Sequence, residues 1–274
     1  MSYKTILVHL SNDKAHMTRL RIGIGLATRY EAHLVALYIA TPISMPAEIA
    51  GRAASTAYLA EATEAARERA QHVRAEIESW CARQKLSWEW QTGEGDHLDI
   101  LARHANYADL AVVSHSRAEL VEDRVIFHVP EHLPLVAPCP VIVLPTEGEP
   151  TPIEGHVMIA WKECRQSARA VEDAIPVLKR AGKVTVLTVL PAEQEAVPGQ
   201  ALVAYLARHG VAAQAVNDIN GGGIGEVILA HARQEKASLL VMGAYGHSRL
   251  REMVMGGVTR HVLNNLSVPV LLAH

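Results

Sequence analysis

The sequence has little cysteine. Its 274 residues include three, Cys81, Cys139 and Cys164, which lie far apart and form no C-x-x-C or Cys/His ligand spacing. An odd number of unclustered cysteines provides neither a disulfide framework nor a zinc-finger pattern, and it suits a reduced cytosol. The sequence therefore argues against a disulfide-stabilised secreted domain and against a cysteine-based metal centre.

The sequence also lacks a strong charge imbalance and a long apolar run. The formal net charge is -3, from 26 Lys and Arg against 29 Asp and Glu, so no polybasic surface for nucleic acid is indicated. No segment approaches the roughly 18 consecutive apolar residues of a membrane span, and the opening MSYKTILVHLSNDK lacks the pattern of a secretory signal. We expect a cytoplasmic protein with no nucleic acid and no membrane among its partners.

The common phosphate-binding loops are absent as well. No G-x-x-x-x-G-K-[ST] occurs, and GGGIGE at residues 221–226 departs from G-x-G-x-x-G because Glu226 stands at the last glycine. Gly23 and Gly25 lie within a helical pattern, where they favour close packing over ligand binding. Neither a P-loop nor a Rossmann-type dinucleotide site is predicted.

The sequence does contain an internal repeat. A shift of 129 residues overlays residues 100–114 on 229–243 and residues 139–144 on 268–273. Between the copies, LPTEGEPTPIEG is rich in Pro, Gly and Glu, which is typical of a linker. We expect one domain at residues 1–146, a linker at 147–155 and a second domain at 156–274, in keeping with the length.

Short apolar runs alternate with helical patterns in each copy. In the first, strands are predicted at residues 5–10, 33–40, 87–92 and 110–114, and helices at 15–30, 53–83 and 96–106. Runs that are apolar throughout indicate strands covered by helices on both faces. Pro140 and Pro269 open the last run of each copy, which places it at a sheet edge where it could pair with the other copy. The predicted fold class is α/β, with two doubly wound domains and parallel sheets.

Four glycines lie between an apolar run and a helical pattern near the end of the second copy: Gly243, Gly246, Gly256 and Gly257. In open parallel sheets, ligands bind beyond the carboxyl ends of the strands, and a helix N-terminus offers unpaired N–H groups to an anion. Thr259 can add a hydroxyl, and His247 and Arg249 can add further donors. The stretch predicts a phosphate-binding loop; glycines that serve only turns and close helix packing are the alternative.

The spacing G-x2-G-x9-G followed by Val-Thr resembles the nucleotide loop of the universal stress protein family. With the two repeats, the resemblance covers essentially the whole chain and points to a tandem member. It implies five-stranded domains of the adenine nucleotide alpha hydrolase-like type that pack as an intramolecular pseudo-dimer. It also implies ATP or a related adenine nucleotide, with or without Mg, in the second copy. The implied cofactor-binding residues are Gly243, Gly246, His247, Gly256, Gly257, Val258, Thr259, Val189, Ala160, Trp161 and Lys162.

By this resemblance, Gly243, Gly246 and Gly256 bind phosphate through main-chain groups, Thr259 supports them, and Val189 lines the adenine side. Two positions depart from the family pattern, because Gly257 and Lys162 stand where Ser and Asp are frequent. An ammonium cannot accept a hydrogen bond from ribose or base, but it can attract phosphate as a point charge. The neighbouring Trp161 would either stack on a base or plug the pocket.

The first copy has no such loop. The shift of 129 residues places Ser114, Arg117, Phe127 and His128 where the second copy has its four glycines. We therefore expect the first copy to be degenerate for nucleotide and to support its partner. A different anion pocket made by His115, Arg117 and His128 is the alternative, although polar residues on a loop are more often solvated.

The sequence presents no poised nucleophile and no paired acid and base, so no catalytic residue and no metal ligand is predicted. The densest Asp/His cluster is Asp96, His97, Asp99 and His104, which we interpret as exposed helix residues rather than a metal site. We expect a non-catalytic, nucleotide-binding regulator of the stress response with an unknown protein partner, and a further homodimer of chains stays open. The alternatives are a slow ATP hydrolase, in which a metal and His247 position water, and a docking protein whose pocket binds no nucleotide.

Overall fold

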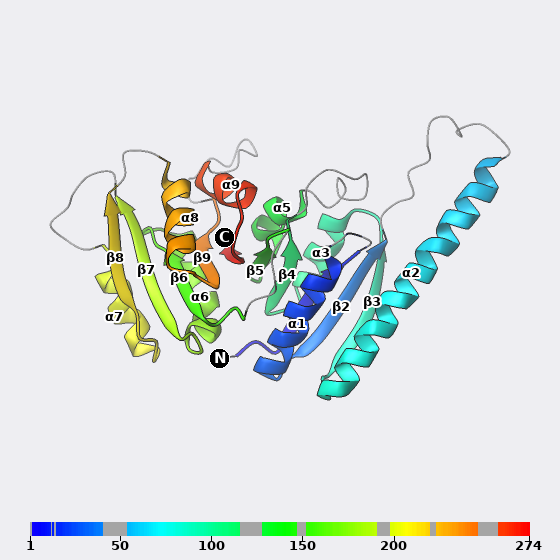
Figure 1. The fold of residues 1–274 in the computed structure, drawn as a ribbon, viewed down its shortest axis with the longest axis horizontal. Coiled ribbons are helices and arrows are strands. Elements are labelled where there is room, and N and C mark those ends of the chain that lie inside the picture. The colour runs from blue at the N-terminus through cyan, green and yellow to red at the C-terminus, as the bar shows by residue number, and fades with distance from the viewer. Residues whose placement is uncertain are drawn as a thin grey trace.

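The computed structural model describes residues 2–11, 13, 15–40, 54–115, 128–146, 152–190, 198–219, 223–245 and 257–274. These residues form one ten-stranded sheet with helices on both faces (Figure 1). Among them, no helix combines the length and the apolar content that crossing a bilayer requires.

The N-terminal half contributes five strands in the order β3-β2-β1-β4-β5, and each neighbouring pair is parallel. Its elements along the chain are β1 (Thr5–Leu10), α1 (His16–Tyr30), β2 (His33–Ala40), α2 (Ala54–Gln84), β3 (Trp88–Glu94), α3 (His97–Ala105), β4 (Leu110–Ser114), α5 (Val129–Val136) and β5 (Val141–Leu144). The bounds of β1, β2 and β4 are those predicted from the sequence, and those of β3, α1, α2 and α3 differ by one or two residues.

The C-terminal half repeats this arrangement in the order β10-β9-β6-β7-β8, again with parallel pairs. Its elements are β6 (His156–Ala160), α6 (Arg165–Leu178), β7 (Lys183–Leu190), α7 (Gln200–Arg208), β8 (Gln214–Ile219), α8 (Ile224–Gln234), β9 (Leu239–Gly243), α9 (Gly257–Asn264) and β10 (Val270–Ala273). The two halves are therefore doubly wound domains of the same topology, as the repeat predicts.

The last strands of the two halves join them into one sheet. Antiparallel pairing sets Val270 opposite Val143, Leu271 opposite Ile142 and Leu272 opposite Val141. The prediction that these proline-led strands lie at the edge of each half and could pair across the repeat is confirmed. Although β5 and β10 run in opposite directions, the sheet twists so far that β2, β3, β7 and β8 all end at the top of Figure 1.

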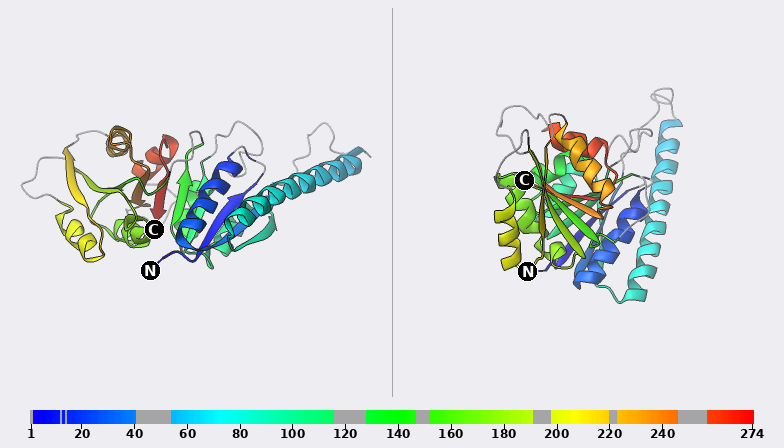
Figure 2. Two further views of the ribbon diagram at one scale, coloured as in Figure 1. Left: turned by 60° about the horizontal axis from the view of Figure 1, so that its bottom comes forward. Right: turned by 60° about the vertical axis from the view of Figure 1, so that its left-hand side comes forward.

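Helices lie on both faces of the sheet (Figure 2). Each face buries its own apolar layer, and each layer runs through both halves. One layer contains Ile6 and Val8 and is covered by α1, α2, α6 and α7. The other contains Leu7 and is covered by α3, α5, α8 and α9. Successive strand residues point to opposite faces, so strands that are apolar throughout fill both layers at once.

Polar contacts between the halves reinforce the strand pairing. The hydroxyl of Tyr3, just before β1, donates to the main-chain oxygen of Asp173 in α6 at 2.7 Å. Arg29 at the end of α1 pairs with the nearly buried Glu154, with Nε and Oε2 2.8 Å apart. The Arg180 guanidinium lies 5.2 Å from the ring centroid of Tyr30, within cation–π range.

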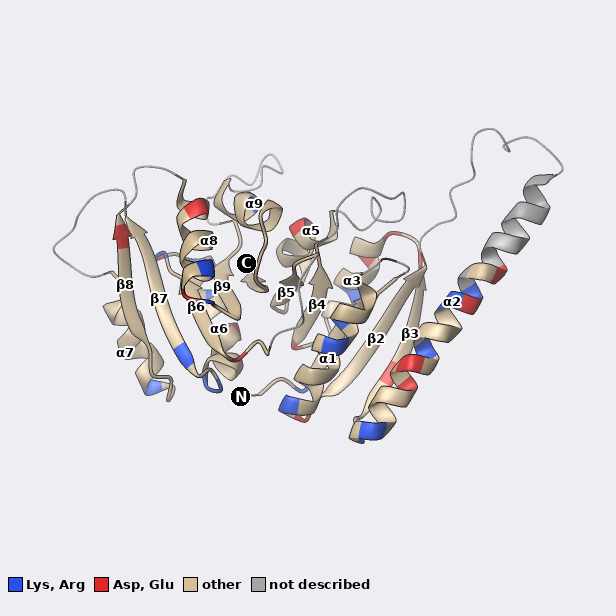
Figure 3. Cartoon of the chain, in the orientation of Figure 1, with Lys and Arg blue, Asp and Glu red and all other residues tan. Residues whose placement is uncertain are grey.

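Charged side chains are interspersed rather than gathered by sign. Figure 3 shows Lys and Arg alternating with Asp and Glu along α2 and scattered over the other described elements. The ion pair of Glu64 with Arg67 on α2 is exposed at both ends, as expected for a solvated helix face.

Two glycines of α1 have opposite surroundings. A Cβ added to Gly23 would lie 2.3 Å from Cγ2 of Val8 in β1, whereas a Cβ added to Gly25 would meet no atom of the described part of the chain within 4 Å. The sequence-based interpretation of close packing is therefore confirmed for Gly23 and wrong for Gly25. The reason is helical phase, because Gly23 faces the sheet and Gly25 faces outward.

Substituting these two glycines by alanine should change stability in opposite directions. Gly23→Ala should lower the free energy of unfolding by about 1–3 kcal/mol, because the methyl group overpacks the contact between α1 and β1. Gly25→Ala should raise it by about 0.5–1 kcal/mol, because alanine is the better helix former at an exposed site. Urea unfolding of both variants against the parent chain measures this, and equal effects would show that α1 does not lie on β1 in this register.

Candidate functional site

The carboxyl ends of β6 and β9 form the edge at which the sequence places a ligand; we call it the β6/β9 edge. β6 pairs with β7 on one side and β9 on the other, so the strand order reverses there. Such a reversal opens a crevice beyond the strand ends, where α/β proteins bind ligands. Ala160 ends β6, Gly243 ends β9, and α9 begins at Gly257, close above the sheet in Figure 1.

The structure brings several expected site residues to this edge and to the same face. Ala160, Val189 and Val258 all belong to the apolar layer covered by α8 and α9. Trp161 is half-buried and packs in the opposite layer, and its main-chain N–H donates to the oxygen of Leu187 at 2.8 Å. The indole thus packs on the face covered by α6, whereas the neighbouring expected residues lie on the other face.

Gly243 lies where β9 and the first turn of α6 approach each other closely. A Cβ at this position would lie 2.5 Å from the main-chain nitrogen of Ser167 and 2.6 Å from the carbonyl carbon of Gln166. Backbone atoms cannot yield as a side chain can, so only glycine lets α6 approach β9 this closely. The contact gives Gly243 a packing role that holds whether or not a ligand is present.

Thr259 lies in the first turn of α9 and is 3 % exposed. Its Oγ1 accepts the main-chain N–H of Tyr245 at 3.4 Å, which ties the helix to the end of β9. Tyr245 has the left-handed backbone angle φ of +61°, which turns the chain sharply there. A Cβ added to the exposed Gly257 at the start of the helix would have no atom of the described residues within 4 Å.

The rest of the predicted loop lies outside the described residues. This applies to Gly246, His247 and Gly256, and to Arg249. Lys162, one residue beyond Trp161, is exposed.

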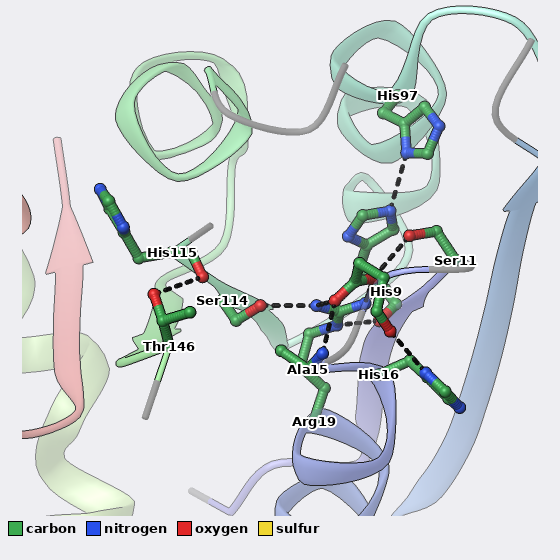
Figure 4. Close-up of polar contacts among 10 residues, drawn as sticks. His9, Ser11, Ala15, His16, Arg19, His97, Ser114, His115 and Thr146 are labelled. Atoms are coloured by element: carbon green, nitrogen blue, oxygen red, sulfur yellow. Dashed lines mark hydrogen bonds and ion pairs between the residues drawn. The ribbon is translucent and has the colours of Figure 1, made fainter. Parts of the chain in front are cut away.

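The corresponding edge of the N-terminal half, at the ends of β1 and β4, holds a buried ion pair that local sequence patterns did not reveal (Figure 4). Arg19 of α1 is 0 % exposed and pairs through both terminal nitrogens with the carboxylate of Asp13, one of these bonds being 2.8 Å long. The same guanidinium donates to the main-chain oxygen of His9 at 2.5 Å and to Oγ of Ser114 at 2.5 Å. We call Arg19, Asp13, His9 and Ser114 the Arg19 network.

The Arg19 network determines the charge of its members. Burial alone would raise the pKa of Asp13, but the charge and hydrogen bonds of Arg19 outweigh burial and hold that pKa well below its usual range. Burial, reinforced by the charge of Arg19, lowers the pKa of His9 well below its ordinary value. Asp13 is therefore a carboxylate and His9 a neutral imidazole at neutral pH.

A second buried histidine touches this network. Nε2 of His9 lies 2.9 Å from Nδ1 of His97, and the rings meet edge to face with centroids 5.1 Å apart. Burial lowers the pKa of His97 to about 4. The interpretation of the Asp96 to His104 cluster as exposed residues is thus wrong for His97, because α3 turns this ring toward β1. Asp96 serves as the N-cap of α3, and its side chain accepts the N–H of Asp99 at 3.0 Å.

The C-terminal half has small residues where the Arg19 network stands. Strand pairing shows which residues of the two halves correspond. In the first half Ile6 of β1 lies opposite Leu110 of β4, and in the second half Val157 of β6 lies opposite Leu239 of β9. Adding 151 to a residue number therefore leads from β1 to β6, and adding 129 leads from β4 to β9. With these shifts the counterparts of His9, Asp13, Arg19 and Ser114 are Ala160, Cys164, Ala170 and Gly243. The same edge is therefore filled with polar side chains in one half and lined with small ones in the other.

Comparisons with known proteins agree with this repeated architecture. A family model described as the universal stress protein family matches residues 2–145 and again residues 155–274. The structure of a universal stress protein from Archaeoglobus fulgidus DSM 4304 is similar, with a TM-score of 0.76 and 16 % identity, over 98 % of this chain and 95 % of that chain. A functionally unknown protein from Pseudomonas aeruginosa PAO1 has a TM-score of 0.67 and 19 % identity, over 99 % of this chain and 92 % of its own.

A curated sequence relative matches a short stretch only. Universal stress protein Slr1230 of Synechocystis sp. is 46 % identical over 46 residues, which span 17 % of this chain and 16 % of that protein. At the identities of the solved structures, the likeness shows the fold, and the family follows from the matches to both halves.

The buried ion pair gives a prediction for stability. Asp13→Asn should lower the free energy of unfolding by about 3–5 kcal/mol, because it leaves the Arg19 guanidinium buried without a counter-charge. The double variant Asp13→Leu with Arg19→Met should lose less than Asp13→Asn alone, since no charge then stays in the interior. Glu64→Gln, in the exposed pair with Arg67, serves as the control and should change stability by less than about 0.5 kcal/mol. The single variants Asp13→Leu and Arg19→Met complete a double-mutant cycle. If the loss in the double variant equals the sum of the two single losses, Asp13 and Arg19 do not stabilise each other.

The two buried histidines give a prediction for pH. Their pKa values are depressed in the folded chain, so the unfolded chain binds more protons as the pH falls below about 6.5. The free energy of unfolding should therefore fall as the pH drops from about 6.5 toward 4, by up to about 1.4 kcal/mol per pH unit for each histidine. His97→Gln should make this slope shallower, whereas His72→Gln on the exposed side of α2 should leave it unchanged. Urea titrations at several pH values measure the slopes, and identical slopes for parent and His97→Gln would refute the assignment.

Proposed function

The chain belongs to the universal stress protein family, and from this premise we propose that its C-terminal half binds an adenine nucleotide at the β6/β9 edge. The contrast between the two edges carries the proposal. Ala170 and Gly243 let α6 pack closely on β9, on one face of the sheet. On the face covered by α8 and α9, Ala160 stands where the first half has the buried imidazole of His9. A small residue on this face, at a reversal of strand order, is where an α/β protein has room for a ligand.

The start of α9 supports the placement of phosphate. Gly257, Val258 and Thr259 form its first turn, where main-chain N–H groups have no partner within the helix. These groups and the positive end of the helix dipole favour an anion, and the small Gly257 allows it to come close. Lys162 is exposed beyond the end of β6, where an ammonium can attract the same phosphates as a point charge.

The apolar layer beneath this edge supports the placement of the base. Ala160, Val189 and Val258 contribute apolar surface on the face covered by α8 and α9, and an adenine ring needs such a surface. Trp161 packs on the opposite face, which favours a structural role for the indole over stacking on the base. In this arrangement the nucleotide lies across the switch point, with its phosphates toward α9.

We further propose that the bound nucleotide regulates contacts with another protein in the stress response and that the chain is not a catalyst. ATP with Mg is the expected form, and hydrolysis to ADP is the alternative activity. A nucleotide that bridges α9 and the ends of β6 and β7 would bind only when these elements hold their folded positions. Binding would therefore stabilise the C-terminal half and the surface that it presents.

Isothermal titration calorimetry with ATP, ADP and AMP, each with and without Mg, tests the proposal on the whole chain. Gly257→Asp should weaken binding by about tenfold or more, because a carboxylate at the helix start repels phosphate. Gly257→Asn is the matched control, since it has the same shape without the charge, and it should bind within about threefold of the parent. Both variants should fold, because Asp and Asn are well tolerated at helix starts.

Three outcomes of this experiment are decisive. Loss of affinity in Gly257→Asp alone supports phosphate at the start of α9. An absence of heat with all three nucleotides in the parent chain would sink the proposal and favour a docking protein. Phosphate release in the same samples above that of Gly257→Asp would replace the non-catalytic role with slow hydrolysis.

A further inference from the structure

Three side chains at the start of α5 present metal-ligand atoms to one another. His128, Glu131 and His132 each contribute one such atom, and these atoms all lie within 4.8 Å of one another. Their spacing of i, i+3 and i+4 sets them on one face of the first helical turn. Nothing in the proposed nucleotide site uses these residues.

The ring of His132 is oriented as a ligand requires. Its Nδ1 lies 2.9 Å from the main-chain oxygen of His128, and because a carbonyl can only accept, this nitrogen carries the proton. The lone pair is then on Nε2. Metal-binding histidines commonly fix their tautomer in this way, with the second ring nitrogen donating to a carbonyl or carboxylate.

Glu131 supplies a carboxylate to the cluster, and this residue is only 5 % exposed. Its Oε2 lies 3.7 Å from Nδ1 of His128, so the carboxylate and the first imidazole already face each other. The main chain of Glu131 is held from the other half of the molecule, because the hydroxyl of Tyr245 donates to its carbonyl oxygen in a short bond. A buried carboxylate on a fixed backbone, flanked by two imidazoles, is stabilised by a cation bound between them.

We propose that His128, Glu131 and His132 bind one divalent transition-metal ion of the zinc class. Two imidazole nitrogens and one carboxylate oxygen suit Zn²⁺, Co²⁺, Ni²⁺ and Cu²⁺, whereas Mg²⁺ and Ca²⁺ prefer oxygen ligands. Bonds of about 2.0–2.2 Å require the ligand atoms to close to roughly 3.4 Å from one another. The exposed ring of His128 can rotate to complete this approach. Three protein ligands leave a fourth position for water or another donor.

The ion would lie at the junction of the two halves. α5 packs against α9 and β10 of the C-terminal half, and the two helices stand side by side in Figure 1. Tyr245, which holds Glu131, also donates its main-chain N–H to Thr259 in α9. The metal site is thus connected to the start of α9 by a single residue, although the proposal stands independently of nucleotide.

Zinc titration of the whole chain without an added histidine tag tests the site, by calorimetry and by competition with a chromophoric chelator. The parent chain should bind one Zn²⁺ with an affinity that falls by about tenfold or more in His128→Gln, Glu131→Gln and His132→Gln. His72→Gln is the matched control, since it removes an imidazole from a His–Glu pair on α2 for which the described residues supply no third ligand. This variant should retain the parent affinity.

Two further measurements distinguish binding at these three residues from nonspecific binding of metal to the surface. Cu²⁺ loaded at one equivalent should show electron paramagnetic resonance coupling to two imidazole nitrogens in the parent and to one in His132→Gln. Zn²⁺ should raise the unfolding temperature of the parent and of His72→Gln but not of His132→Gln, which also shows that the variant folds. The proposal is overturned if the His128 and His132 variants bind zinc within about twofold of the parent, or if the copper signal is the same in both.

Discussion

The antiparallel pairing of β5 with β10 is the contact on which the rest of the structure depends. Each half ends in a short strand that is led by a proline and would otherwise expose an unpaired edge. Joining the two edges closes both, and it makes the apolar layers of the two halves continuous on each face of the sheet. The pairing also sets α5 of one half beside α9 of the other, so residues more than a hundred positions apart in sequence, such as Glu131 and Tyr245, come into contact.

Within this shared frame the two halves have diverged at the same place. Strand register shows that the ends of β1 and β4 correspond to those of β6 and β9, yet one edge carries Arg19 and Asp13 and the other carries Ala170 and Cys164. A shared topology therefore does not make the two edges alike. The side chains at the reversal of strand order differ, and they make the two otherwise similar halves unequal.

The sequence predicted the fold well and the interior polar contacts poorly, for a physical reason. Repeats, apolar periodicity and the two strand-leading prolines are local signals, and they were sufficient for the element order, the parallel sheets and the edge strands. The Arg19 network joins residues from β1, α1 and β4 and from the turn after β1, and no local pattern reports that they meet.

One signal of a buried polar contact was present in the sequence, because Arg19 lies in the helical phase of Gly23, Ala27 and Tyr30, all of which are buried. A charged residue on the buried stripe of a helix indicates a partner elsewhere in the chain. Gly243 shows the same limit, since sequence alone could not reveal its contact with the backbone of α6.

The ion pair of Arg19 and Asp13 also restricts how the first half can change over evolutionary time. A substitution that removes either charge alone leaves the other charge buried without a partner. Each single substitution toward an open crevice therefore gives a less stable protein. Two replacements would have to become fixed together, and Ser114 and His9 would still need new hydrogen-bond donors. The network therefore makes it difficult for the first half to lose its buried charges in separate steps, whereas no such pair of charges restricts Ala160 and Ala170 at the corresponding positions of the second half.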